Sequence, residues 1–286
     1  MAATSTIILG DSLKLMPRAD WYGRAAFLFA DPPFNIGHGY RGFNDNKPPA
    51  KFRKFIKKLC RVAWESVDPK RGVIALHGPD DLAELYLRYA RKLGFANNRI
   101  AWVNWHYRFG QCRRTNWIDA RCHCLLFAKN PGGHTWNPEA VEVDSDRATK
   151  YNDRRTERYA NGGRRLPGTV WGVPSDGPFW GRVTGNSKER RPGHPNQLPE
   201  VYLERLIKAY SNAGDLIVDP FAGSGTTAAV ATALGRNVAT YDISPESTAS
   251  VRARLTVGAV RANNGHHERK RTKTESDKRR KGIAKP

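Results

Sequence analysis

The sequence contains no apolar run close to the roughly 20 residues that are needed to span a bilayer. Its first residues, Met-Ala-Ala-Thr-Ser-Thr, lack the basic region and apolar stretch that mark a secretory leader. Only four cysteines occur, and they form no Cys-x-x-Cys pair. These absences argue against a membrane span and a disulfide framework, so we expect a soluble protein that works in the cytoplasm.

Clustered metal ligands are also few. Cys112, Cys122, His123 and Cys124 lie close in sequence, but their spacing matches no common zinc finger. No metal site is therefore predicted. His106 and His123 are interpreted as hydrogen-bonded strand residues without a catalytic role.

Acidic residues are scarce relative to basic ones. There are 27 Asp and Glu against 48 Lys and Arg, which gives a formal charge of +21 at pH 7. Such a charge favours a polyanionic partner, and nucleic acid is the most common one. Apolar residues make up 39% of the chain, enough for one sizeable α/β core with a smaller appended region.

Short apolar runs, bounded by Gly, Pro or Asp, alternate with segments of helical character. This rhythm predicts a mostly parallel, buried sheet of seven strands with helices on both faces. The expected strands cover residues 6–9, 25–30, 72–76, 99–105, 122–127, 216–218 and 238–241. Helices are expected from about Pro79, over 198–213, and from the glycine-rich turn to Gly235.

Two segments do not fit this rhythm. From about residue 132 to 195 the composition shifts to Gly, Pro, Asn, Arg and Trp, which predicts a loop-rich insertion. Residues 261–286 are basic and almost free of large apolar side chains, so we expect a tail that is disordered until it binds an anion. We therefore divide the chain into a first half of the core, a last core strand with the insertion, a second half of the core, and the tail: 1–110, 111–193, 194–260 and 261–286.

A glycine-rich turn follows one predicted strand and opens a helix. It reads Asp219-Pro-Phe-Ala-Gly-Ser-Gly-Thr-Thr227, and its two glycines let the backbone approach a nucleotide-like ligand. Asp242 ends the next strand, where a carboxylate can accept both hydroxyls of a ribose. Gly223-x-Gly225-x-x-Ala228 also satisfies the fingerprint of nicotinamide dinucleotides. The match by itself leaves both kinds of cofactor open.

The position of this turn distinguishes the two. A nicotinamide fold of the usual order places several strands after the turn, but only about forty residues follow Asp242 and many belong to the tail. The other strands must therefore precede it, as in a permuted doubly wound sheet. A second motif, from Asp31 to Phe34, follows one of these earlier strands and reads Asp-Pro-Pro-Phe.

Methylation of an exocyclic amino group needs a motif of this kind. The lone pair of adenine N6 or cytosine N4 is delocalised into the ring, so the amine is a poor nucleophile. The Asp31 carboxylate and the Pro32 carbonyl can accept hydrogen bonds from its two N–H groups and so favour a tetrahedral nitrogen. The paired prolines stiffen the turn, and Phe34 offers a face to an extruded base. An isolated tetrad also fits an ordinary strand-ending turn, but its pairing with the late glycine-rich turn favours catalysis.

The two motifs together resemble the amino-DNA methyltransferases of the β group, in which Asp-Pro-Pro-aromatic precedes an Asp-Pro-Phe-x-Gly-x-Gly loop. The resemblance covers most of residues 5–257. Residues 8–12 are similar to the family's first strand and turn, residues 194–199 to its His-Pro-Thr-Gln-Lys-Pro segment, and Val170-Trp171 also fits. The resemblance implies a permuted Rossmann-like methyltransferase sheet, direct methyl transfer, and a target recognition region within about 110–193.

The same resemblance implies S-adenosylmethionine as the cofactor and double-stranded DNA as the substrate. The implied catalytic residues are Asp31, Pro32, Pro33 and Phe34. Cofactor contacts are implied in the first turn, the tetrad, the His-Pro segment and the glycine-rich loop, at Asp11, Ser12, Asp31, His194, Gln197, Asp219, Phe221, Ala222, Gly223, Ser224, Gly225, Thr226 and Asp242.

Three positions depart from the family pattern. Leu198 replaces a lysine, which removes a cation expected near the cofactor carboxylate or the DNA. Asp242 replaces a glutamate and still reaches a ribose if the backbone moves in slightly. Phe34 replaces a tyrosine, keeping the stacking face and losing only a hydroxyl.

The first residue of the tetrad bears on the target base. In this family aspartate goes mostly with adenine, whereas serine is frequent among cytosine-N4 enzymes, so Asp31 predicts adenine N6. Cytosine N4 and a catalytically inactive DNA-binding relative are the alternatives. Cytosine C5 methylation needs a cysteine after a proline, which this chain lacks, and the motif order opposes RNA or protein amide methylation. A homodimer and a cognate restriction endonuclease are further candidate partners.

Two basic segments are candidates for DNA contact. The stretch 35–58 carries Tyr40, Arg41, Phe43, Lys47, Lys51, Arg53, Lys54 and Lys57. Its second half also fits a helix, because Phe52, Phe55, Ile56 and Leu59 recur at helical spacing. In the insertion, arginines lie among aromatic residues, a mixture suited to phosphates and base edges: Arg154, Arg155, Arg158, Arg164, Arg165, Arg182, Arg190 and Arg191 with Trp171, Phe179 and Trp180.

Overall fold

A computed structural model describes most of the chain. The described residues are 3–39, 43–107, 110, 114–159, 161–173, 176, 180–184, 187–194 and 196–260. The predicted disordered tail 261–286 lies outside them, as do Tyr40, Arg41, Cys112 and Phe179.

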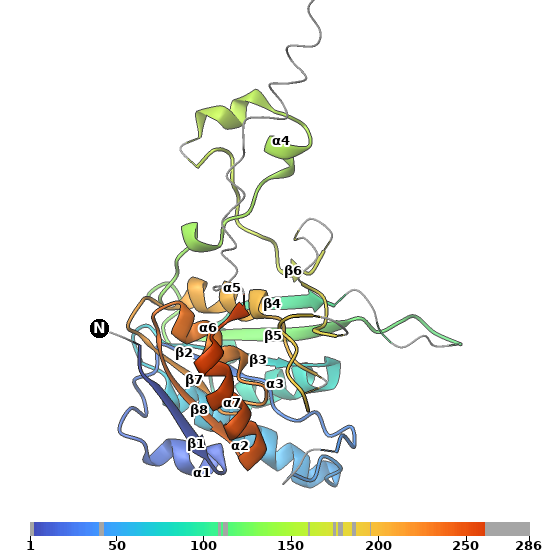
Figure 1. Cartoon of the computed structure of the whole chain (residues 1–286), viewed down its shortest axis with the longest axis vertical. Helices are drawn as coiled ribbons and strands as arrows, with labels where there is room; N and C mark the ends of the chain where they lie inside the picture. Colours follow the sequence, from blue (N-terminus) through green and yellow to red (C-terminus); the bar gives the residue numbers. More distant parts are fainter. Residues whose placement is uncertain are drawn as a thin grey trace, which may run out of the picture.

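One mixed sheet forms the centre of the described chain (Figure 1). It has eight strands in the order β1-β8-β7-β2-β3-β5-β4-β6, and every neighbouring pair is parallel except the two pairs made by β5. The strands are β1 Ser5–Leu9, β2 Phe27–Ala30, β3 Val73–Gly78, β4 Arg99–His106, β5 Arg121–Ala128, β6 Val170–Trp171, β7 Leu216–Asp219 and β8 Asn237–Asp242.

Helices cover both faces of this sheet. One face carries α1, α2 and α3, and the other carries α5, α6 and α7. The α-helices are α1 Ser12–Leu15, α2 Pro49–Ser66, α3 Asp80–Lys92, α4 Asp146–Thr149, α5 Glu200–Tyr210, α6 Thr226–Ala233 and α7 Pro245–Val257. Short 3-10 helices are η1 Met16–Arg18, η2 Ala96–Asn98, η3 Glu139–Val141 and η4 Arg154–Arg158.

The sequence of β2 shows why the sheet has two covered faces. All four of its residues are buried apolar residues. Phe27 and Phe29 pack into the cluster on the α5 side, whereas Leu28 and Ala30 pack into the cluster on the α2 side. Because successive side chains of a strand alternate between faces, a continuous apolar run is expected for a strand buried on both sides.

The predicted permuted α/β fold is confirmed, with one correction to the strand count. The seven predicted strands exist within one or two residues of their expected ends. The eighth strand, β6, comes from the insertion that we expected to be irregular, and its two residues pair with Asn104 and Trp105 at the sheet edge. A two-residue strand has no periodic pattern, so only the pairing partner reveals it. The helix α7 was also not predicted, because its few buried residues give no clear apolar stripe.

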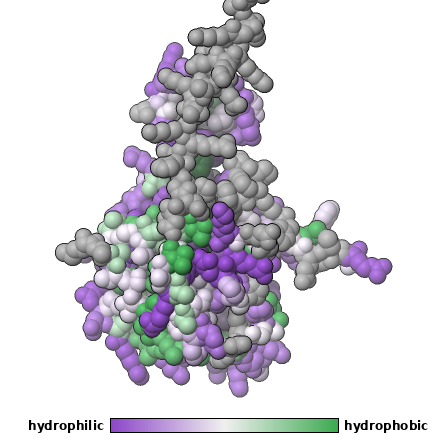
Figure 2. All heavy atoms as spheres, viewed as in Figure 1, coloured by the Kyte–Doolittle hydropathy of each residue, from purple (hydrophilic) through white to green (hydrophobic). Residues whose placement is uncertain are grey.

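Two segments project from the sheet. A lobe that carries α4 and η4 stands above one end of the molecule, and an arm extends sideways from β4 and β5 (Figure 1). The coloured atoms of this lobe that Figure 2 shows are mainly hydrophilic. Among the described helices, none is long and apolar enough to cross a membrane.

Candidate active site

The two predicted motifs meet where the order of the sheet reverses. The chain runs from β7 through α6 to β8 on one side, and from β2 through α2 to β3 on the other. Strands β2 and β7 are parallel neighbours, with Leu28 opposite Val218. Asp31 directly follows β2 and Asp219 ends β7, so both lie at the same edge of the sheet. Ligands of open α/β sheets bind at such a switch point. The two motifs therefore lie at the ends of adjacent parallel strands.

Asp31 and Asp219 form an electrostatically unusual pair. Burial, and then the negative charge of Asp219, raises the pKa of Asp31 from 3.8 to about 8. Burial also raises the pKa of Asp219 to about 6, although hydrogen bonds from Thr227 and the Phe221 N–H oppose the shift. The Oδ1 atom of Asp31 is shielded from solvent and accepts no hydrogen bond within the described residues. This edge therefore presents an acceptor that lacks a donor.

The residues after Asp31 form a tightly held turn. Pro32 is buried, and Phe34 packs partly against the α2-side cluster. The buried Asp45 carboxylate accepts hydrogen bonds from the N–H groups of Asn35, Ile36 and His38, at 2.8, 3.2 and 2.9 Å. Asp45 thus fixes the chain that leaves the tetrad. This role of Asp45 was not predicted, because nothing in the linear pattern of residues points to it.

The glycine-rich turn is held from both sides. The Ala222 N–H donates to the Tyr241 carbonyl at 2.8 Å, and Gly225 N–H donates to the Ala222 carbonyl at 2.7 Å. Gly225 has φ +75°, and a Cβ there would lie 3.2 Å from Val251 of α7. A side chain at position 225 would therefore meet α7, so this glycine permits close packing of the loop on a helix.

Asp242 connects the turn to the end of β8. Its Oδ2 accepts from Gly223 N–H at 2.9 Å and its Oδ1 from Ser244 N–H at 2.8 Å. Burial raises the pKa of Asp242, and these two hydrogen bonds oppose the shift. The Asp242 carbonyl also accepts from Gly10 N–H at 2.8 Å, which brings the first turn to the same edge.

Asp11 and Ser12 begin α1 directly after that turn. Asp11 caps the helix, because its Oδ1 accepts from Leu13 N–H at 3.1 Å, while Ser12 is buried. Asp11 also lies 3.5 Å from Lys14 Nζ. The structure therefore places both residues at the predicted edge, with Asp11 already serving as a helix cap.

The His-Pro segment packs against the glycine-rich turn. His194 is half-buried, which lowers its pKa, while the nearby charge of Asp242 raises it. The Gln197 amide bridges Arg191 N–H, at 3.0 Å, and the Glu189 carbonyl, at 2.6 Å. Gln197 thus holds this segment together. Pro195 lies outside the described residues.

A buried ion pair lies behind the turn. Arg254 of α7 and Glu200 of α5 have fully buried side chains, and Arg254 Nη2 donates to Glu200 Oε1 at 2.7 Å. Arg254 Nη1 also donates to the Ser224 carbonyl and to Thr226 Oγ1, at 3.2 and 2.8 Å. This pair links two helices to the turn across 54 residues of sequence, a separation that no local motif reveals.

Some predicted DNA-contacting residues lie elsewhere. Trp171 and Trp180 are buried rather than exposed, and the Arg205 guanidinium lies over both rings. The two rings anchor the insertion to α5. Because they are buried, they are not available to DNA. His123 accepts from Trp102 Nε1 and contacts Asp80, at 3.0 and 2.7 Å.

The stretch after the tetrad is helical in its second half, as the alternative interpretation expected. In α2, Phe52, Ile56 and Leu59 are buried. The cations of its outer face are exposed, at Lys51, Arg53, Lys54 and Lys57.

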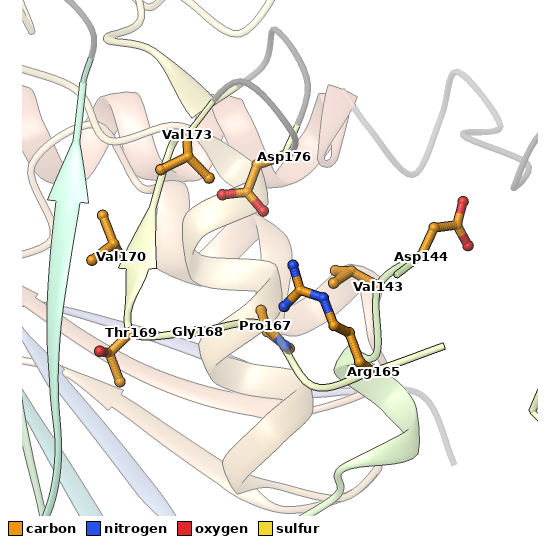
Figure 3. A pocket seen from close by; sticks show the side chains of 9 residues that line it. All are labelled: Val143, Asp144, Arg165, Pro167, Gly168, Thr169, Val170, Val173 and Asp176. Atoms are coloured by element: carbon orange, nitrogen blue, oxygen red, sulfur yellow. The ribbon is translucent and has the colours of Figure 1, made fainter. Parts of the chain in front are cut away.

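A separate pocket of about 230 Å³ lies at the base of the lobe. Figure 3 shows Arg165 and Asp176 extending toward its space beside Val173. Asp176 is committed to Arg205, at 3.2 Å, and to Gly172 N–H, at 2.9 Å. Because β6 is separated from β2 by three strands, this pocket is distinct from the Asp31 edge.

The residues at the Asp31 edge fit the cofactor implied by the sequence. The unsatisfied Asp31 Oδ1 suits a ligand N–H donor. The acidic side chains of Asp31, Asp219 and Asp242 suit a cationic ligand, because a nearby positive charge lowers their raised pKa values and favours the carboxylate form. Asp242 also lies at the strand end where a ribose is bound in nucleotide folds.

Comparison with known proteins agrees with this geometry. DNA adenine methyltransferase YhdJ of Escherichia coli (strain K12) is 28% identical over 246 residues, which cover 84% of this chain and 79% of YhdJ. The solved PvuII DNA methyltransferase (cytosine-N4-specific) has a TM-score of 0.64 at 17% identity and covers 93% of this chain and 94% of its own. TTHA0409 of Thermus thermophilus, solved in complex with S-adenosyl-L-methionine, has a TM-score of 0.57 at 18% identity over 89% and 95% of the two chains.

At these identities the two solved structures establish the fold, and they agree with the permuted sheet described above. The family itself is established by a sequence model of N6/N4 DNA methylases, which matches residues 25–252 and so spans both motifs. The chain therefore belongs to the N6/N4 DNA methylase family.

Proposed function

We propose that this protein transfers a methyl group from S-adenosylmethionine to N6 of adenine in duplex DNA. The observation that carries the proposal is the unsatisfied Asp31 Oδ1 at the switch point, next to Asp219 and the glycine-rich turn. Such an acceptor favours an amino-group substrate, because it gains the donor that it lacks.

The chain's own residues would activate the amine. Asp31 accepts one N–H of the target amine and the Pro32 carbonyl accepts the other, so that the nitrogen lone pair is withdrawn from the ring. Phe34, which is partly exposed, offers a face to the base after it leaves the duplex. When bound, S-adenosylmethionine supplies an electrophilic methyl group. Asp219, Asp242, His194 and the turn from Phe221 to Thr226 would hold that cofactor.

Cytosine N4 is the second candidate target. The PvuII enzyme of the same fold is named for it, whereas YhdJ is named for adenine. Both amines are delocalised and need the same pair of acceptors, so the choice depends on the shape of the base site. The aspartate at position 31 supports adenine.

DNA would approach over the edge that carries Asp31. The arm between β4 and β5 projects from this edge, because β4 ends there at His106 and the antiparallel β5 begins there at Arg121. Trp117 on this arm is 89% exposed and Arg114 is exposed beside it. Figure 2 shows hydrophobic and strongly hydrophilic side chains together on the arm. A basic, aromatic projection of this kind suits a nucleic-acid duplex.

The wider organisation follows from this assignment. We propose 1–110 and 194–260 as the catalytic and cofactor-binding halves of the core, with the last core strand and target recognition in 111–193. The basic tail adds sequence-independent affinity in this proposal. A homodimer and a cognate restriction endonuclease are compatible partners.

The test is methyl transfer to unmethylated genomic duplex DNA with labelled S-adenosylmethionine, followed by digestion to nucleosides. We expect label in N6-methyladenosine, and at least a hundredfold loss with Asp31→Ala, because one preorganised acceptor is worth about that much. Asp20→Ala removes an exposed aspartate far from the site and should be fully active. Label in N4-methylcytosine would establish the second candidate, and absence of label in every DNA would refute both.

A further inference from the structure

The proposed cofactor carries charges of both signs. Its sulfonium and ammonium groups are positive, and its methionine carboxylate is negative. The candidate site is rich in acidic groups, with Asp31, Asp219 and Asp242 at one edge. These carboxylates favour the positive groups, but the methionine carboxylate needs a cation or several N–H donors.

The nearest cation behind the turn cannot reach a ligand. Arg254 is completely buried, and its guanidinium is bound to Glu200, the Ser224 carbonyl and Thr226. It stabilises the turn from behind. Position 198, where the family has lysine, carries a leucine whose side chain packs in the α5-side core.

Arg191 has more donors to spare than Arg254, of which only Nε lacks an acceptor among the described residues. The Nε and Nη2 atoms of Arg191 are shielded from solvent and donate to no acceptor among the described residues. The cost of leaving donors of a buried guanidinium unpaired is about 1–3 kcal/mol or more for each group. A site that tolerates this cost is suited to an anion that supplies the missing acceptors.

Arg191 also lies near residues that contact the glycine-rich turn, since Arg254 binds the Ser224 carbonyl and Thr226. The Arg191 N–H is fixed by the Gln197 side chain at 3.0 Å. Its charge is close enough to Arg254 to lower the pKa of that residue, which burial also lowers and Glu200 raises. Three residues further along the segment, His194 is close enough to Asp242 for that carboxylate to raise its pKa against the effect of burial.

We propose that the Arg191 guanidinium binds the methionine carboxylate of S-adenosylmethionine, through its Nε and Nη2 donors. Arg191 then replaces the lysine that position 198 lacks, and Gln197, which is bound to the Glu189 carbonyl, holds the Arg191 backbone in place. Arg191, one of the arginines predicted to contact DNA, thus binds the cofactor instead. This inference rests on the proposed cofactor.

The test compares two ligands that differ only in the carboxylate, S-adenosylmethionine and decarboxylated S-adenosylmethionine. Binding to the full chain is measured by calorimetry without DNA, so that methyl transfer does not enter. Arg191→Met should weaken binding of S-adenosylmethionine at least tenfold, because a charge-assisted hydrogen bond is worth about 1.5–3 kcal/mol. Binding of the decarboxylated ligand should change less than twofold.

Matched variants make the result specific. Arg190→Met removes a neighbouring exposed arginine and should leave both affinities unchanged. Arg191→Lys keeps a charge without the planar fork and should retain part of the preference. An equal loss for both ligands in Arg191→Met, or a wild-type protein that binds both ligands equally, would overturn the inference while leaving the cofactor assignment intact. A wild-type protein that binds neither ligand would overturn the proposed function and the inference together.

Discussion

A carboxylate oxygen that is shielded from water and lacks a donor opposes folding, and Asp31 Oδ1 is such an atom. The fold keeps it because adjacent strand ends bring it beside Asp219. A residue of this kind is expected at a functional site, where strain is retained for binding. Its cost gives a prediction that does not depend on finding the DNA recognition sequence.

We expect Asp31→Asn to stabilise the folded protein at pH 8. The pKa of Asp31 rises from 3.8 to about 8 in the fold, so unfolding releases a proton between these values and rising pH destabilises the wild type across that range. Asparagine does not ionise. Each unit of pKa corresponds to about 1.4 kcal/mol of unfolding free energy. Because Asp31 is partly exposed, solvent screening reduces the expected gain in the free energy of unfolding to roughly 2 kcal/mol.

Urea denaturation of both proteins without cofactor measures this difference. The gain in free energy of unfolding should be near zero at pH 4 and reach its full value near pH 8. A gain of equal size at both pH values would show that Asp31 is ionised in the fold. The asparagine variant should also lose methyl transfer, because it offers one acceptor oxygen and an amide in place of a carboxylate.

At the scale of elements, α5 and α7 are joined through charge rather than apolar packing alone. Arg254→Met should lower the free energy of unfolding by about 3–5 kcal/mol, because it leaves the Glu200 carboxylate buried without its partner. The double variant Glu200→Gln with Arg254→Met should recover a large part of that loss. Thermal unfolding of the two single variants and the double variant checks this.

If the two single losses simply add in the double variant, the pair does not act as a unit. The double variant should still bind S-adenosylmethionine more weakly than the wild type, since Arg254 also holds the Ser224 carbonyl and Thr226. Stability and cofactor affinity are thus expected to separate in this variant.

The arm between β4 and β5 gives a prediction about DNA. Trp117→Ala should weaken binding to duplex DNA about tenfold, because stacking of a base on an aromatic ring is worth roughly 1–3 kcal/mol. The melting temperature and the affinity for S-adenosylmethionine should not change, since Trp117 is 89% exposed. Fluorescence anisotropy with labelled duplex DNA measures the affinity.

Two variants control this experiment. Trp117→Phe keeps a stacking face and should restore most of the affinity. Trp136→Ala removes a tryptophan that packs on Tyr210, near the start of β3 at the opposite edge, and should leave DNA affinity unchanged. Unchanged DNA affinity in Trp117→Ala would mean that DNA does not touch the arm.

At the scale of the whole molecule, the chain order explains where the chemistry lies. The sheet reverses between β7 and β2, so segments near the two ends of the chain build one edge. The insertion adds an edge strand, β6, and is anchored through Trp171 and Trp180 over Arg205. The lobe and the arm are thus carried by a rigid sheet, which is how variable recognition segments are usually positioned.

The sequence by itself determined the core of this protein. Continuous apolar runs such as β2 can be satisfied only inside a sheet covered on both faces, and the Asp-Pro-Pro-Phe and glycine-rich turns mark the ends of particular strands. Their order along the chain was enough to predict the permuted topology. These are local patterns, in which a few consecutive residues carry the whole signal.

Only the tertiary structure decided which distant groups meet. Contacts between separate segments create the ion pair between Glu200 and Arg254 and the three hydrogen bonds that the Asp45 carboxylate accepts. They also determine that two donors of Arg191 are left without acceptors among the described residues. The edge strand β6 and the burial of Trp171 depend on a partner strand and helix in the same way. A charged or aromatic side chain in a sequence has no burial of its own, and folding alone determines whether it faces water, an ion or a ligand.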